Sequence, residues 1–171
     1  MTPEYQFYHG AFLHEIITSS GRELRITLRD FFGRPDAFVI DGKIGILIKH
    51  SSARITPWLF TFTKDHVAEL CALRAQTKVC FIALVCGEDG FVCVRDSDLV
   101  EILAPTDTDV ASIRVERRPR KMYGVSSSGK SLDGKLARGV QEIVAAITQH
   151  DTEGNLAVVT PIHSTNVDSE N

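Results

Sequence analysis

No run of apolar residues in the 171-residue chain approaches the length of a membrane-spanning helix, which is ~20 residues. The first residues, Met-Thr-Pro-Glu-Tyr, also lack the basic-then-apolar layout of a secretory signal. These two absences predict a cytoplasmic protein with no membrane partner. The apolar fraction of 43% and the charged fraction of 24% are ordinary for a soluble globular protein.

The four cysteines include no Cys-x-x-Cys pair, the spacing on which many zinc sites are built. Three of the four lie in apolar runs that resemble strands. We therefore predict buried free thiols and no metal bound by sulfur. The cysteines are Cys71, Cys80, Cys86 and Cys93.

Residues 151–171 contain no lysine or arginine, but they contain four carboxylates. The whole chain carries a net charge of −3, so the remainder carries +1 when this −4 is removed. We expect a single α/β domain over residues 1–149 and a flexible acidic tail over 150–171. Because the chain without residues 151–171 is not acidic, local basic patches indicate binding partners better than the total charge does.

Hydrophobic periodicity predicts alternating helices and strands with no internal repeat. Residues 5–19 and 64–76 have helical patterns, and Thr63 is a suitable N-cap for the second. On that second helix, the expected buried side carries Val67, Leu70, Cys71 and the stem of Arg74. A half-buried strand over 22–29, an almost wholly apolar strand over 78–86 and an alternating strand over 111–118 are also expected. The remaining expected elements are an extended piece at 58–62, a strand at 91–95, a short helix to residue 103, a Ser/Gly-rich loop over 119–135 and a helix from Leu136 through Ile147.

The pair Asp41-Gly42 separates two β-prone runs, 37–40 and 44–48, and predicts a hairpin with a two-residue turn. In that register Asp36 pairs with Leu47, and Lys49 lies two residues further along the same face. An acid and a lysine would then lie side by side at the open end of the hairpin.

Pro35-Asp36, the hairpin and the strand ending in Lys49 resemble the PD-(D/E)xK nuclease superfamily, most closely the archaeal Holliday-junction resolvases. The resemblance covers residues 7–86. It implies a nuclease-like α/β sandwich with an α-β-β-β-α-β core, here with an extra C-terminal strand and helix. Residues 43–124 also resemble an uncharacterised bacterial protein family with similar Ile-Lys-His-Ser, Pro-Trp, Phe-Thr-Phe and Arg-Arg-Pro-Arg runs.

The sequence departs from the nuclease pattern at Leu47, where the family has its second carboxylate. The resemblance implies Asp36 and Lys49 as catalytic residues and Mg²⁺ as the cofactor. Glu15 on the first helix could supply the missing carboxylate, which would make Asp36 and Glu15 the metal ligands. The alternative is that Asp36 is only a turn residue and Lys49 only a solvated strand end.

Two groups of cations are candidates for contact with nucleic acid, because guanidinium groups bind phosphate in a bidentate manner. Near them, Tyr123 could stack on a base. The structural alternative is a charged edge strand. The first group comprises Lys49, His50 and Arg54, and the second comprises Arg114, Arg117, Arg118, Arg120 and Lys121.

The segment 124–131, Gly-Val-Ser-Ser-Ser-Gly-Lys-Ser, matches the Walker A pattern in its letters. It lacks the buried strand before it and the helix at the lysine that a phosphate loop needs, so we interpret it as a Ser/Gly loop.

These patterns favour a nucleic-acid-binding protein of nuclease-like fold with weak or lost Mg²⁺-dependent phosphodiesterase activity. The alternative is a non-catalytic module that docks a protein partner through an exposed apolar patch, for instance around Trp58 or Phe60. Neither pattern indicates DNA or RNA, the form of the substrate, the oligomeric state or the pathway.

Overall fold

The computed structural model describes residues 1–103 and 110–156, with side chains as far as Thr152. The expectations for residues 104–109 and 157–171, including most of the predicted acidic tail, lie outside this range. The described elements, in chain order, are α1 (Glu4–Ser20), β1 (Ile26–Phe31), β2 (Arg34–Ile40), β3 (Ile44–Ser51), β4 (Trp58–Thr63), α2 (Lys64–Gln76), β5 (Val79–Cys86), β6 (Phe91–Arg95), α3 (Asp96–Ile102), β7 (Val110–Glu116), β8 (Gly124–Ser127), β9 (Lys130–Ser131) and α4 (Gln141–Leu156).

The larger of two sheets has the strand order β1-β2-β3-β5-β6. Strands β1, β2 and β3 form an antiparallel meander, and the chain then crosses through α2 to place β5 parallel to β3. Strand β5 is buried over nearly its whole length, as its continuous apolar run predicts for a strand covered on both faces. The α/β class expected from the sequence is confirmed.

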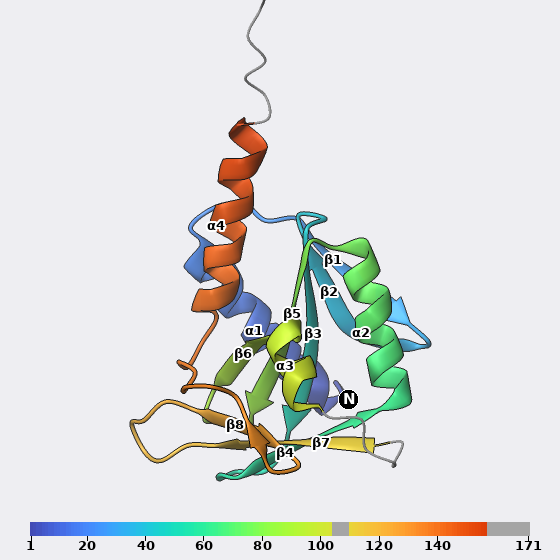
Figure 1. Ribbon diagram of the computed structural model, residues 1–171. Helices are drawn as coiled ribbons and strands as arrows, with labels where there is room; N and C mark the ends of the chain where they lie inside the picture. The colour runs from blue at the N-terminus through green and yellow to red at the C-terminus, as the bar shows by residue number, and fades with distance from the viewer. Residues whose placement is uncertain (104–109, 157–171) are drawn as a thin grey trace, which may run out of the picture.

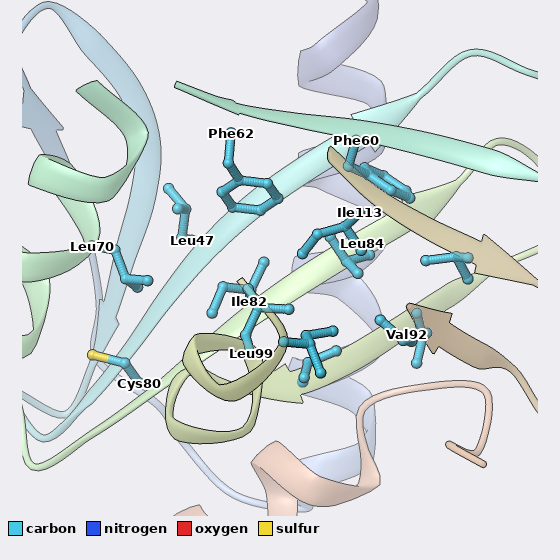
Figure 2. Close-up of a cluster of buried hydrophobic side chains, with 14 of the residues drawn as sticks. Leu47, Phe60, Phe62, Leu70, Cys80, Ile82, Leu84, Val92, Leu99 and Ile113 are labelled. Atoms are coloured by element: carbon cyan, nitrogen blue, oxygen red, sulfur yellow. The ribbon is translucent and has the colours of Figure 1, made fainter. Parts of the chain in front are cut away.

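The smaller sheet, of order β4-β7-β8-β9, packs against one face of the larger sheet, beside α2 and α3 (Figure 1). Figure 2 shows Phe60, Phe62 and Ile113 of the smaller sheet meeting Leu47 and Ile82 of the larger one. Helices α1 and α4 cover the opposite face and bury a second apolar cluster there. The sequence predicted the extended segments that form β4 and β7, but neither β8 and β9 nor their assembly into a second sheet.

The hairpin between β2 and β3 differs by one residue from the predicted register. Ile40 pairs with Ile44 and Ala37 with Leu47, so three residues connect the strands. Asp41 and Gly42 do adopt positive φ angles of 51° and 68°. The turn residues were therefore identified correctly, but the predicted pairing of Asp36 with Leu47 is wrong.

Strand β1 is an edge strand and is more exposed than its alternating pattern predicted, with Leu28 52% exposed. The two neighbouring helices contact the inner strands of the sheet, α1 at β3 and α2 at β3 and β5. Leu28 at the edge therefore stays uncovered.

The C-terminal part differs from expectation in two further ways. The segment predicted as a Ser/Gly loop contains β8 and β9, which form a hairpin whose turn residues Ser128 and Gly129 have φ angles of 45° and 81°. The Walker A-like letters thus lie on a β-hairpin, not on a strand-to-helix phosphate loop. The last described helix starts at Gln141 rather than near Leu136 and continues to Leu156, so the first residues of the predicted tail are helical.

Among residues 1–103 and 110–156, no helix is both long and apolar enough to cross a membrane.

Candidate functional site

Helix α2 starts where the sequence predicted, with Thr63 as the N-cap residue. The cap is unusual because a histidine completes it: the Thr63 backbone N–H donates to His66 Nδ1 at 3.0 Å. This bond fixes the imidazole ring at the start of the helix and turns Nε2 toward the large sheet. The cap therefore also positions a titratable side chain.

Two cations approach the other nitrogen of that ring. Lys49 Nζ lies 2.8 Å from His66 Nε2, and Arg34 Nη1 lies 2.7 Å from the same atom. An imidazolium between two cations would be strongly disfavoured. Burial, followed by the charges of Lys49 and Arg34, lowers the pKa of His66 to about 4, so the ring is neutral at physiological pH.

The buried face of α2 is one residue away from the predicted face. His66, Glu69, Leu70 and Leu73 are buried, whereas Val67 is 46% exposed and Cys71 is exposed. Both sets have spacings of three and four residues, so periodicity alone does not choose between them. The apolar residues favoured the wrong set, and Glu69 was missed for that reason. The unused signal was the pair Leu70 and Leu73, which share a face with His66 and Glu69.

Glu69 is the most unusual side chain of the site. It is completely buried, and neither of its carboxyl oxygens has a hydrogen-bond partner. Burial, followed by the negative charge of Asp36, raises the pKa of Glu69 to about 7, against the opposing effect of Lys49 and Arg34. An unpaired buried carboxyl costs about 1–3 kcal/mol, so packing does not account for it. Such a group is a candidate for function.

Asp36 and Lys49 belong to the same cluster. Burial lowers the pKa of Lys49, and the negative charges of Asp36 and Glu69 act in the opposite direction. Asp36 thus acts electrostatically on Lys49, His66 and Glu69. The two residues predicted from the sequence thus interact through charge but form no ion pair with each other within the described residues, and the predicted strand pairing was wrong.

A second histidine approaches Asp36 from α1. His9 Nε2 is 3.9 Å from Asp36 Oδ1, is buried and has no hydrogen-bond partner. Burial lowers the pKa of His9, and the charge of Asp36 partly offsets this effect.

Glu15 is not brought to this cluster. It is six residues beyond His9 on α1, which corresponds to about 9 Å along the helix axis. Its Oε1 lies against Gly139, 2.9 Å from the position that a Cβ would occupy there, and its charge acts on Cys93. The prediction that Glu15 supplies the second carboxylate beside Asp36 therefore has no support in the geometry, and Glu69 is instead the buried carboxyl on which the charge of Asp36 acts.

Magnesium binds to a few carboxylates and completes an octahedron with water and substrate phosphate oxygens. Glu69 offers two oxygens that accept no hydrogen bond, but they are fully buried and are linked to Asp36 only through charge, so the side chain would have to become accessible before the two carboxylates could hold an ion together. Within the described part of the chain, no three His, Cys, Asp or Glu side chains form a ready-made metal cage.

The predicted arginine cluster divides into paired and unpaired members. Arg114 forms an ion pair with Glu116. Arg117 donates to Asp89 at 2.5 Å and stacks over the Tyr123 ring at 4.9 Å. Tyr123 is fully buried, so the prediction that it stacks on a base is wrong.

The other cations predicted to contact nucleic acid are exposed. Arg118, Arg120 and Lys121 lie in the turn after β7, and Arg54 lies in the loop before β4. His50 is exposed at the end of β3 and stacks on Tyr8 with a centroid distance of 5.1 Å.

Trp58 and Phe60, named above as parts of a docking patch, are 2% and 1% exposed. They belong to the core between the two sheets, where Trp58 Nε1 donates to the Ala53 carbonyl at 2.8 Å. An apolar docking surface cannot be built from these two residues.

Comparisons with protein-family models, with curated proteins and with solved structures find no match to this chain. The arrangement of the site is therefore the basis for any statement about function.

Proposed function

We propose that this protein is a nucleic-acid-binding protein of nuclease-like fold, with a Mg²⁺-dependent phosphodiesterase site formed by Asp36, Lys49 and Glu69. The observation that carries the proposal is Glu69, a fully buried carboxyl with two unpartnered oxygens whose pKa responds to the charges of Asp36 and Lys49. The second carboxylate that is missing at Leu47 in β3 is supplied in this proposal by the neighbouring helix α2. This proposal includes cleavage of the nucleic acid, whereas the sequence favoured binding with weak or lost cleavage.

The element order supports the nuclease-like fold. Helix α1, the antiparallel meander β1-β2-β3, the crossover helix α2 and the parallel strand β5 follow the α-β-β-β-α-β order that the resemblance implies. The chain departs from that order by placing β4, a strand of the second sheet, before α2.

Each member of the site has a distinct role in the proposal. The carboxylates of Asp36 and Glu69 would hold Mg²⁺. The ion, when bound, neutralises charge on the scissile phosphate and lowers the pKa of a bound water. Lys49, held at 2.8 Å from His66 and subject to the charges of both carboxylates, would stabilise the charge that develops on the phosphate. Neutral His66 lies next to this lysine without adding a positive charge, so it does not compete with Lys49 for the phosphate.

The test is cleavage and binding of labelled duplex, branched and single-stranded DNA and RNA, with Mg²⁺ or Mn²⁺, over a series of salt concentrations. Metal-dependent cleavage should be lost by at least about a hundredfold in Asp36→Asn, Glu69→Gln and Lys49→Met. Glu15→Gln is the matched control, and it should retain wild-type cleavage because Glu15 lies against Gly139.

The outcomes separate the candidate functions. Salt-dependent binding without cleavage by the wild type would reduce the protein to a nucleic-acid binder. Cleavage that survives Glu69→Gln but not Glu15→Gln would contradict the assignment of the second carboxylate. The absence of binding at low salt would overturn the nucleic-acid proposal and leave the protein-docking module.

A further inference from the structure

A tight turn after β7 displays three cations. Lys121 N donates to the Arg118 carbonyl at 3.0 Å, closing the turn Arg118-Pro119-Arg120-Lys121. The third residue of this turn, Arg120, has a positive φ of 61°. A side chain in this left-handed conformation costs roughly 1–2 kcal/mol, and glycine is the residue that avoids the cost. A positive charge thus occupies a position where the backbone alone favours glycine.

The turn borders a groove of about 760 Å³. Arg118, Lys121 and Lys135 line it, together with the hydroxyl-bearing Thr56 and the apolar Met122. Lys135 comes from a different segment, and its side chain passes over Gly124 of β8 to reach the groove. A Cβ at Gly124 would clash with the Lys135 ammonium group.

The charges of this groove are not balanced within the described residues. Its carboxylate, Glu116, is paired with Arg114, and its arginine Arg117 is paired with Asp89. Arg118, Lys121 and Lys135 form no ion pair with any residue in the ranges 1–103 and 110–152. A concave surface with several unneutralised cations is suited to a polyanion.

Strand β4 connects this groove to the Asp36–Lys49–Glu69 site. Thr63, at the end of β4, binds His66 of that site. At the other end, the Thr56 hydroxyl accepts a hydrogen bond from the Arg117 backbone N–H at 3.2 Å beside the groove. The six residues of β4 span about 20 Å at ~3.3 Å each. Figure 1 shows β4 running along one end of the molecule and leading into α2.

We propose that the groove formed by Arg118, Lys121 and Lys135 is a second phosphate site, which holds the nucleic-acid backbone about 20 Å from the Asp36–Lys49–Glu69 site. This inference rests on the proposed function. Phosphates follow one another at about 3.4 Å along one strand of a duplex, so the two sites are separated by about six phosphates. The protein therefore requires a polymer that reaches both sites, and a nucleotide or short fragment occupies only one of them.

Fluorescence anisotropy tests this inference on labelled duplexes of about 4 to about 16 base pairs. Affinity should rise steeply once the duplex exceeds about six base pairs, because both sites are then occupied. The double variant Lys121→Ala/Lys135→Ala should abolish this rise and reduce the salt slope of long-duplex binding by about two. The shortest duplexes should bind to it as they bind to the wild type.

Two further variants separate charge from folding. Arg120→Gly removes a charge and the positive-φ cost together, so it should weaken long-duplex binding while stability stays equal or rises. Arg25→Ala/Lys78→Ala removes two exposed cations that directly precede β1 and β5, at the end of the large sheet where Ile40 pairs with Ile44, and should leave binding unchanged.

The experiments give different results if the phosphate-site proposal is wrong and if the proposed function is wrong. If the wild type binds and cleaves but the double variant shows the same length dependence and salt slope, the groove is refuted and the catalytic proposal stands. Full competition by inorganic phosphate or a mononucleotide would reassign the groove to a small anion. Binding of an acidic peptide in place of every duplex would overturn both proposals.

Discussion

Replacing Glu69 with glutamine tests the most unusual group in the structure without changing its shape. In the wild type, burial and the charge of Asp36 raise the pKa of Glu69 from 4.5 to about 7. The native state therefore binds a proton that the unfolded state has already released, between pH 4.5 and 7. In this window the contribution of Glu69 to stability is largest at low pH and is lost as the pH rises.

The size of the effect follows from the two pKa values. At about 1.4 kcal/mol per pH unit, a rise from 4.5 to about 7 corresponds to about 3 kcal/mol. Glutamine carries no charge at either end of the window. The free energy of unfolding of Glu69→Gln, relative to the wild type, should therefore increase by about 3 kcal/mol between pH 4.5 and pH 8.

Urea denaturation over a pH series measures this difference. Glu101→Gln, which changes an exposed glutamate of α3, is the matched control and should run parallel to the wild type. Parallel curves for Glu69→Gln and the wild type would refute the reasoning, because they would mean that Glu69 is solvated or paired in the native state. A second readout uses the metal: Mg²⁺ at neutral pH should stabilise the wild type against urea but not Glu69→Gln.

Two other substitutions test how the site is held together. Burial and two adjacent cations lower the pKa of His66 from 6.5 to about 4, so its contribution to stability is present above pH 6.5 and is lost as the pH falls toward 4. As the pH is lowered through that window, the free energy of unfolding of His66→Gln should therefore rise relative to that of the wild type, by up to about 3 kcal/mol. Urea denaturation measures this difference. A difference that stays constant with pH would contradict the inference that the His66 ring is neutral in the native state. A Cβ on Gly45 of β3 would lie 2.7 Å from Leu73 Cγ of α2, so Gly45→Ala should push the helix that carries His66 and Glu69 away from the sheet. We expect it to destabilise the protein by about 1–3 kcal/mol and to reduce cleavage disproportionately, whereas Gly10→Ala, which meets no neighbour, should do neither.

Local chemistry was sufficient for the positions of many elements. Thr63 marked the start of α2, the apolar run marked β5, and Asp41-Gly42 marked the hairpin turn. Each of these signals depends on a few neighbouring residues, namely a cap, a doubly buried strand or a pair of positive φ angles. Pro35-Asp36 and Lys49 were singled out in the same way.

The register and the faces of the elements depended on packing. One additional residue in the turn changed the pairing of Leu47 from Asp36 to Ala37. A rotation of α2 by one position brought Glu69 to the interior in place of Val67. In both cases two local patterns of similar quality competed, and the total burial against the sheet decided between them.

The sequence by itself determined the α/β class, the turn residues and the start of α2, because neighbouring residues encode these features, and it singled out Asp36 and Lys49 as candidate site residues. The tertiary structure alone decided that the charges of Asp36 and Lys49 act on Glu69, and that Glu15 lies against Gly139 instead. It also decided that the smaller sheet separates the Arg118–Lys121 turn from that site by the length of β4. The physical reason is that both relationships join residues far apart in the chain, and such contacts form only when the two apolar clusters are buried together.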